Sequence, residues 1–254
     1  MRERIFGRNP VFEALRAGRR VPFRLLVAEG VLEKGRVADI LEISRQKQVL
    51  IERVARQNLG QYGENHQGVV LEASGYPYSG LLDMLALAEQ RGEPPFLLVL
   101  DALQDPQNLG TLLRTAEIVG VHGVLLPLRQ TATVTPAVVS ASSGASEHLL
   151  VSQVNLAQAI REIKQAGVWV IGLDAGDKAQ RVERVRLDGP LALVVGSEGE
   201  GMRQLIRESC DILMCLPMRG SIESLNAAVA GSVALYLAWQ ARGYGSDVSP
   251  VDHR

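Results

Sequence analysis

The spacing of hydrophobic positions in the first 75 residues predicts a small module in which strands and helices alternate. Asn9 and Pro10 carry the signals of a helix start, and Gly18 carries that of a helix end. A second helix is predicted over about 34–47, because its apolar residues recur on one helical face. Apolar runs typical of strands lie at 23–27, 49–51 and 68–71.

A stretch at residues 74–80 breaks every periodicity and is typical of a linker. Beyond it, helical patterns such as 158–165 and 202–209 separate short apolar runs. The predicted strands lie near 96–100, 123–126, 168–173, 191–195 and 212–216. This alternation predicts an α/β fold with a parallel sheet and helices on both faces. We therefore expect a small N-terminal α/β domain at 1–74, a linker at 75–92 and a larger domain at 93–254.

The composition describes a globular chain. It has 254 residues, of which 46% are hydrophobic, enough to fill a core. Apolar runs such as 96–100 are far shorter than the roughly 20 residues of a membrane span, and no signal-type stretch follows the first residues. Cys210 and Cys215 have no histidines at metal-ligand spacing, so we expect buried reduced thiols. We predict a soluble cytoplasmic protein without a membrane segment or a metal.

Charge is distributed unevenly along the chain. The formal net charge is −1, which argues against a protein that coats nucleic acid indiscriminately. Residues 1–75 nevertheless hold 13 Arg and Lys against 9 Asp and Glu, whereas residues 76–254 hold 14 against 19. Arginine suits phosphate contacts and base stacking. The N-terminal excess fits an RNA-binding module and a solvated surface equally well.

Three segments follow predicted strands, at the sheet edge where open α/β folds bind their ligands. The first segment, 101–110, leads into a helix and brings in Asn108 and Arg114. Taken alone, these two residues are better explained as a helix cap and a surface cation.

The second segment runs from a buried strand into a loop with three glycines, Gly196, Gly199 and Gly201, and with the acids Glu198 and Glu200. Glycines let a backbone approach a ligand closely. The acids would repel a phosphate, no lysine follows, and the spacing is not that of a dinucleotide loop. The loop is therefore neither a Walker loop nor a nicotinamide fingerprint.

The third segment, 216–226, continues into a helix crowded with small residues at 227–235. Such a helix can pack very closely against another backbone, within the chain or in a second subunit. Ser224 and Asn226 at its start fit the role of caps as well as that of site residues.

Together, N-L-G-T-L-L-R-T-A at 108–116, V-G-S-E-G-E-G-M at 195–202 and L-P-M-R-G-S-I-E-S-L-N-A-A-V-A at 216–230 resemble the three motifs of the SpoU/TrmH methyltransferases. The resemblance covers about residues 96–240. The leading segment 5–11 and its module resemble the ribosomal-protein-L30e-like RNA-binding extension of many members. The chain is most similar to the branch that modifies guanosine in 23S ribosomal RNA.

The resemblance implies a fold and a cofactor. Members of the family have a catalytic domain with a C-terminal deep trefoil knot, act as homodimers and bind S-adenosyl-L-methionine. Residue patterns alone would not predict a knot, because chains rarely thread through themselves. By similarity, the expected cofactor-binding residues are Leu173, Gly196, Gly201, Leu216, Met218 and Leu225.

The resemblance also implies the chemistry, in which a ribose 2'-hydroxyl attacks the cofactor's methyl group without a metal. The family assigns activation of the hydroxyl to the motif-one arginine, here Arg114. A free guanidinium has a pKa above about 12 and is a poor base, so we hypothesise that Arg114 acts with a substrate phosphate or orients the nucleotide. By similarity, Glu198 holds the glycine loop, Ser224 and Asn226 position the ribose or support the arginine, and Asn108 fixes neighbouring backbone or substrate.

Three other functions are compatible with parts of the pattern. Transfer-RNA guanosine 2'-O-methylation is the nearest, although the N-terminal module favours ribosomal RNA. A non-catalytic RNA-binding or ribosome-assembly protein would keep the fold without the reaction. A nicotinamide dehydrogenase fits the α/β pattern but lacks the dinucleotide fingerprint. Cofactor binding distinguishes the last two from a methyltransferase.

Overall fold

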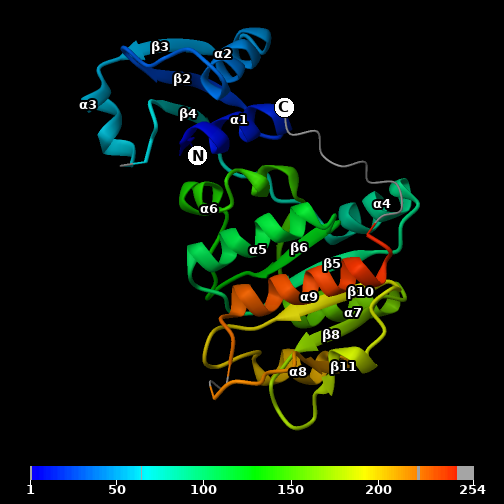
Figure 1. Ribbon diagram of the computed structural model, residues 1–254. Coiled ribbons are helices and arrows are strands. Elements are labelled where there is room, and N and C mark those ends of the chain that lie inside the picture. Colours follow the sequence, from blue (N-terminus) through cyan, green and yellow to red (C-terminus); the bar gives the residue numbers. More distant parts are fainter. Residues whose placement is uncertain (1, 64, 222–223, 245–254) are drawn as a thin grey trace. The chain divides into compact units, whose positions relative to one another are not determined.

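Two β-sheets organise the described part of the chain, which comprises residues 2–63, 65–221 and 224–244 of a computed structural model (Figure 1). The chain divides into two compact units. The first contains the described residues of 1–78 together with Asp105–Glu117 and Ala132–Leu149. The second contains Ser79–Gln104, Ile118–Thr131 and the described residues from Leu150 onward. The helix that carries motif one therefore groups with the N-terminal residues.

The first unit contains a four-stranded sheet in the order β1-β4-β2-β3. Its strands are β1 (Arg2–Phe6), β2 (Pro22–Ala28), β3 (Leu50–Val54) and β4 (Val69–Ser74). Strand β4 pairs antiparallel with both β1 and β2, whereas β2 and β3 are parallel. Sequence reasoning missed β1, because only one of its five residues is buried and its first three are charged.

The helices of this unit are α1 (Arg8–Ala17), α2 (Arg36–Gln46), α3 (Arg56–Leu59), η1 (Gly60–Tyr62), α5 (Pro106–Ile118, up to Glu117), α6 (Pro136–Ala141) and η2 (Ala145–His148). Helix α1 buries Val11, Ala14 and Leu15, the spacing of one helical face. The predicted N-cap at Asn9 is wrong, because the helix begins at Arg8 after Gly7, whose φ of 93° favours glycine.

The second unit contains a seven-stranded sheet in the order β7-β6-β5-β10-β8-β11-β9. Its strands are β5 (Phe96–Leu100), β6 (Gly123–Pro127), β7 (Val151–Val154), β8 (Trp169–Leu173), β9 (Gln180–Arg181), β10 (Leu191–Val195) and β11 (Ile212–Cys215). Every pairing in it is parallel, as the sequence predicts. All residues of β5, β6 and β10 are buried, which explains their continuous apolar sequences.

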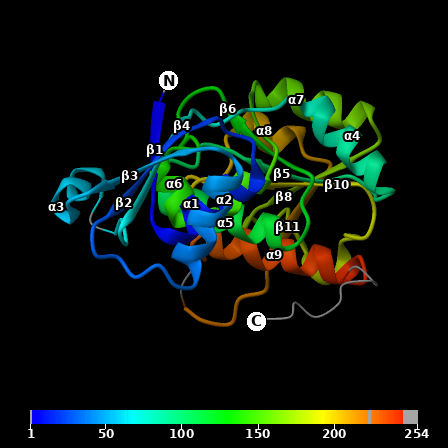
Figure 2. The ribbon, with the colours of Figure 1, turned by 90° about the horizontal axis from the view of Figure 1, so that it is seen from above.

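Helices of the second unit cover both faces of this sheet, as Figure 2 shows. They are α4 (Leu81–Arg91), α7 (Leu156–Gln165), α8 (Gln204–Ser209) and α9 (Ala227–Ala241), with η3 at Val182–Arg184. Helices α4, α7 and α8 pack with Leu97, Val99 and Val194 in one apolar cluster. Helix α9 lies on the opposite face, against β10. No helix among the described residues is long and apolar enough to cross a membrane.

His122, just before β6, is a buried histidine that the fold keeps neutral. Its side chain is 1% exposed, its Nδ1 accepts a hydrogen bond from the Phe96 amide at 3.0 Å, and its Nε2 lies 3.0 Å from Glu93 Oε2. Because Nδ1 accepts, the proton of the neutral ring belongs on Nε2. Burial lowers the pKa of His122, and the opposing effect of Glu93 does not reverse this.

We expect His122 to make the protein less stable in acid. In the unfolded chain this histidine takes up a proton below a pKa of about 6.5, whereas in the folded protein it does so only at lower pH. The contribution of His122 to the free energy of unfolding is therefore complete above a pH of about 6.5. It falls as the pH drops from about 6.5 toward the folded pKa, by up to about 1.4 kcal/mol per pH unit. Urea unfolding of wild type and His122→Gln at about pH 7.5 and 5.5 measures this contribution. The amide oxygen of glutamine keeps the acceptor for Phe96, so equal pH dependence of the two proteins would contradict the assignment.

Candidate cofactor and active site

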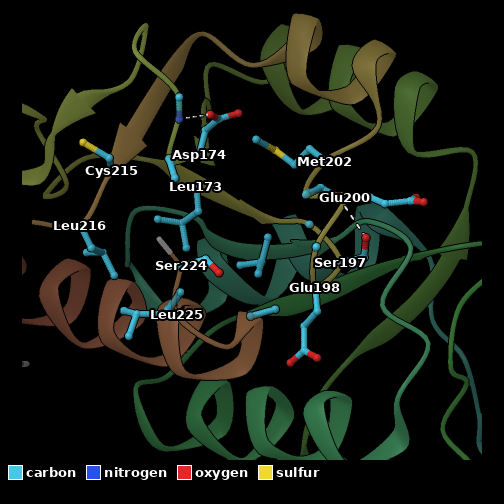
Figure 3. Close-up of a pocket in the computed structure, with 18 of the residues that line it drawn as sticks. Leu173, Asp174, Ser197, Glu198, Glu200, Met202, Cys215, Leu216, Ser224 and Leu225 are labelled. Carbon is cyan, nitrogen blue, oxygen red and sulfur yellow. Dashed lines mark hydrogen bonds between the residues drawn. The ribbon is translucent and has the colours of Figure 1, made fainter. Parts of the chain in front are cut away.

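A pocket of about 680 Å³ lies at the carboxyl ends of β8, β10 and β11, where open parallel sheets bind ligands (Figure 3). Its walls come from the segments 173–176, 195–202, 214–218 and 224–227, together with Arg207 and Ala230. Three of these segments follow a strand directly, and the fourth leads into α9. The sheet therefore brings together loops that are distant in sequence.

The glycine-rich loop after β10 folds back on itself so tightly that Gly196 cannot be replaced without disruption. A Cβ built on Gly196 would lie 2.2 Å from the Gly201 carbonyl carbon and 2.3 Å from the Met202 nitrogen. Ser197 and Gly201 exchange backbone hydrogen bonds of 3.0 and 3.1 Å, and the φ of Gly201 is 69°. The close approach and the left-handed turn explain these two glycines.

An ion pair between a buried carboxylate and an exposed arginine fixes the far end of this loop. Asp101, the residue after β5, has a side chain that is 0% exposed. Its Oδ2 accepts the Arg203 amide at 2.8 Å, and its Oδ1 accepts Arg203 Nε at 2.8 Å. A two-point carboxylate–arginine contact sets orientation as well as distance. The loop is thus held to the end of the neighbouring strand.

Asn226 joins the glycine loop to the start of α9. Its Oδ1 caps the helix by accepting the amides of Ala228 at 2.9 Å and Val229 at 3.1 Å. Its Nδ2 donates a hydrogen bond to Glu198 Oε1. One side chain therefore satisfies two backbone amides that have no partner within the helix, and it also connects motif two with motif three.

The remaining wall is apolar. The pocket is lined by Leu173, Met214, Leu216, Leu225 and Ala227 among others. Leu225 is 45% exposed in this pocket wall, so its side chain is open to a ligand.

The charged groups around the pocket are mainly acidic. Arg207 is the only cation among the described lining residues, and its Nε lies 2.6 Å from Asp174 Oδ2. Figure 3 shows Glu200 pointing away from Leu225. A pocket with mainly acidic charged groups and an apolar wall is better suited to a ligand with a positive charge and an apolar ring than to a phosphate.

The two cysteines are half-buried and free, not fully buried as predicted. Burial raises the pKa of Cys210 to about 12, so its thiol stays protonated. Cys215 lines the pocket at the end of β11. Among the described residues, no group of three histidines, cysteines or carboxylates could hold a metal ion.

Nine of the eleven residues predicted for the site line this one pocket. They are Leu173, Gly196, Glu198, Gly201, Leu216, Met218, Ser224, Leu225 and Asn226. The other two lie on α5, in the first unit. Asn108 is buried inside the helix, which begins earlier than predicted, and exposed Arg114 donates from Nη1 to Ser143 Oγ at 3.3 Å. Ile222 and Glu223 of motif three lie outside the described residues.

Sequence reasoning missed the ion pairs of Asp101 with Arg203 and of Asp174 with Arg207. Both aspartates are the first residue after a strand of the parallel sheet, which is the available sequence signal. Their arginine partners lie in or just before α8, and nothing in the linear pattern indicates these pairings.

Fold and pocket define a parallel α/β protein with a cofactor-sized site at its carboxyl edge. The chain matches the SpoU rRNA Methylase family over residues 95–236, and a family of RNA 2'-O ribose methyltransferase substrate-binding domains over residues 4–79. It is 42% identical over 242 residues to the TrmH family protein YacO of Bacillus subtilis, and the match covers 94% of this chain and 95% of that relative.

A second relative is the 23S rRNA (guanosine-2'-O-)-methyltransferase RlmB of Pseudomonas putida, 38% identical over 242 residues, with 94% of this chain and 97% of that relative covered. Among solved structures, the SpoU methyltransferase AviRb of Streptomyces viridochromogenes in complex with AdoMet has the same fold. Its TM-score is 0.80 at 24% identity, and the match covers 96% of this chain and 92% of that one. The chain belongs to the SpoU methylase family and is an S-adenosylmethionine-dependent RNA 2'-O-methyltransferase.

The pocket suits this cofactor on its own geometry. Its volume of about 680 Å³ lies within the range of small-molecule sites, roughly 300–1,000 Å³. Leucine side chains offer an apolar slot for an adenine ring, while the loop backbone offers hydrogen-bonding groups. Nearby carboxylates suit a cationic sulfonium.

We expect Asn226→Ala to separate stability from function. Loss of the cap should lower the free energy of unfolding by about 1 kcal/mol, and loss of the Glu198 contact should also weaken cofactor binding severalfold. Asn155→Ala is the matched control, because Asn155 caps α7 through the Gln158 amide at 3.2 Å but does not line the pocket. Urea unfolding and cofactor titration of both variants decide the matter. Equal cofactor affinity in the two variants would contradict a role for Asn226 in the site.

Proposed function

We propose that this enzyme methylates the ribose 2'-hydroxyl of a guanosine in 23S ribosomal RNA. The observation that carries the proposal is the pocket in which the loop of motif two and the start of motif three meet, tied by Glu198 and Asn226. The Pseudomonas putida relative, whose name gives this substrate, is similar over nearly the whole chain and supports the choice of RNA and base. Since ribosomal RNA is its substrate, we propose that the enzyme acts in the cytoplasm.

We infer distinct roles for the pocket residues. Leu173, Leu216 and Leu225 would hold the adenine, with Met218 beside them, and the backbones of Gly196 and Gly201 would supply close polar contacts. Ser224 and Asn226 would position the ribose. Glu198 would keep the glycine loop in register through its contact with Asn226.

When bound, the cofactor supplies an activated methyl group, and its transfer to the ribose 2'-oxygen releases one proton. We propose that Arg114 orients the nucleotide and helps a substrate phosphate to accept that proton, because a guanidinium alone is a poor base. Asn108, six residues earlier on α5, would fix the backbone or the substrate. Positioning then accounts for much of the rate enhancement.

We propose that residues 1–74 form an L30e-like RNA-binding domain and that 93–254 form the catalytic domain with a trefoil knot. Residues 75–92 would link them, although this segment includes the packed helix α4. The match of residues 4–79 to a substrate-binding family supports the first assignment. So do Arg2 and Arg36, which lie 4.8 and 4.0 Å from the ring centroids of Phe23 and Phe12. Arginines and aromatic rings are common RNA contacts.

We also propose that the enzyme is a homodimer built on α9. Val229, Val233 and Tyr236 recur on one face of this apolar helix and are 41–47% exposed. An exposed apolar stripe of this kind is typical of a subunit interface. In this arrangement Arg114 would serve the cofactor of the partner subunit.

A mixing experiment tests the shared site. Arg114→Ala and Asn226→Ala are each expected to be nearly inactive. If the two subunits share each site, co-refolded mixtures should recover roughly a quarter of wild-type activity, since half of the dimers then hold one complete site. Methyl transfer by the mixture is the measurement. No recovery above the separate variants would contradict sharing.

Parallel assays of unmodified 23S ribosomal RNA and transfer RNA test the substrate. We expect labelled methyl from S-adenosylmethionine to enter the ribosomal RNA. Label in transfer RNA alone would refute the proposed substrate while leaving the chemistry intact. No label in either RNA, with no cofactor binding, would favour an RNA-binding protein without activity.

A further inference from the structure

Helix α1 of the N-terminal module packs directly on the backbone of Gly144, a residue of the segment between α6 and η2. The φ of Gly144 is 90°, and a Cβ built there would lie 2.6 Å from Glu13 Cβ and 3.2 Å from Pro10 Cα. Only glycine fits such a position. The contact is therefore a fixed feature of this compact unit.

A buried ion pair locks the same two parts together. Arg20 donates from Nε to Glu147 Oε2 at 2.7 Å and from Nη2 to Glu147 Oε1 at 2.9 Å. Both side chains are 1% exposed. Arg20 also contacts Glu3 Oε2 at 2.6 Å and the Ser74 carbonyl at 2.9 Å. A two-point contact without solvent fixes orientation and is costly to break.

Further hydrogen bonds surround this pair. Tyr76 accepts from Arg19 Nη1 at 3.0 Å and donates to the Leu149 carbonyl at 2.5 Å. Burial raises the pKa of Tyr76 to about 12, so the phenol remains a donor. Glu13 Oε2 lies 2.8 Å from His148 Nε2. Residues of the N-terminal module thus hold segment 144–149 along its whole length.

The held segment is continuous with the hydrogen-bond partner of Arg114. Ser143 precedes Gly144, has a φ of 55°, and accepts from Arg114 Nη1 at 3.3 Å. Helix α5 lies close to α6 at Gly110, where an added Cβ would meet Ala141 Cβ at 2.4 Å. A left-handed serine keeps its hydroxyl in place only while its neighbours hold the backbone.

We propose that the N-terminal module positions Arg114 for methyl transfer. By clamping Gly144 and Glu147, the module fixes the backbone of Ser143, and the Ser143 hydroxyl orients the guanidinium. Ser143 and Gly144 are positioning residues, and Arg20 acts through them. The inference rests on the proposed function of Arg114. It makes RNA capture and orientation of the reacting group properties of one compact unit.

Double-mutant cycles on the full-length protein test this inference. Ser143→Ala should lower kcat about tenfold, the size of one hydrogen bond to a charged group, with the KM for RNA and the Kd for S-adenosylmethionine unchanged. Gly144→Ala should lower kcat at least as much. Neither change should reduce activity further when combined with Arg114→Ala, because both act through that residue. Ser140→Ala, on the short helix α6 that precedes this segment, is the matched control and should leave kcat unchanged.

Arg20→Lys extends the cycle to the N-terminal module, since lysine keeps the charge but cannot make the two-point contact with Glu147. It too should lower kcat severalfold and be silent in the Arg114→Ala background. Thermal unfolding will show whether Arg20→Lys folds. If this variant does not fold, the double-mutant cycles at Ser143 and Gly144 alone test the inference. Losses that multiply with Arg114→Ala, or none at all, would overturn this inference while leaving methyl transfer established. No methyl transfer by the wild type would overturn the proposed function itself, and the inference with it.

Discussion

Arg114→Ala is expected to lower methyl transfer by about 10²- to 10⁴-fold, the usual contribution of a group that assists proton transfer. The loss should fall on kcat, because Arg114 lies on α5 and not among the residues that line the cofactor pocket. Affinity for S-adenosylmethionine should therefore be unchanged. Single-turnover methyl transfer and cofactor titration on the same preparation measure the two quantities.

Two controls make the result specific. Arg161→Ala removes an exposed arginine from α7 and should be silent. Arg114→Lys keeps the charge but not the planar fork, so a large remaining defect would show that geometry matters more than charge. Full single-turnover activity of Arg114→Ala would exclude the proposed role.

Gly196→Ala is expected to weaken cofactor binding by ten- to a hundredfold, because overpacking costs about 1–3 kcal/mol. The added methyl group would lie within 2.5 Å of three atoms of Gly201 and Met202, so the glycine loop must open. Both the backbone contacts and the tie from Glu198 to Asn226 depend on that loop. Calorimetric titration with S-adenosylmethionine is the direct measurement.

Gly189→Ala is the matched control for this change. No atom lies within 4 Å of a Cβ built there, and its φ is not in the left-handed region. Near wild-type affinity of Gly196→Ala would mean that the loop does not shape the cofactor site.

The sequence predicted the larger sheet well for a physical reason. Strands such as β5 and β10 are buried on both faces, so they are continuous apolar runs that few other structures produce. The charged strand β1 has no such run, and its pairing with β4 is a long-range contact that local pattern cannot show. The start of α5 was also missed: the helix begins at Pro106, so Asn108 lies inside it and is not its cap.

Some residues of the candidate site could be predicted from the sequence, and others could not. Gly196 and Gly201 were recognisable because a tight turn after a buried strand demands glycine. The pairing of Asp101 with Arg203 joins residues 102 positions apart and depends on the order of strands in the sheet. The role of Arg114 depends on RNA and on a second subunit, so it came from family resemblance and stays a prediction.

The most direct test of the central claim is the identity of the methylated atom. Unmodified 23S ribosomal RNA is incubated with the enzyme and methyl-labelled S-adenosylmethionine, then digested to nucleosides and separated. The label is expected in 2'-O-methylguanosine, and it should be absent when Arg114→Ala replaces the wild type. Label on a base, or no label in the ribosomal RNA, would contradict the account.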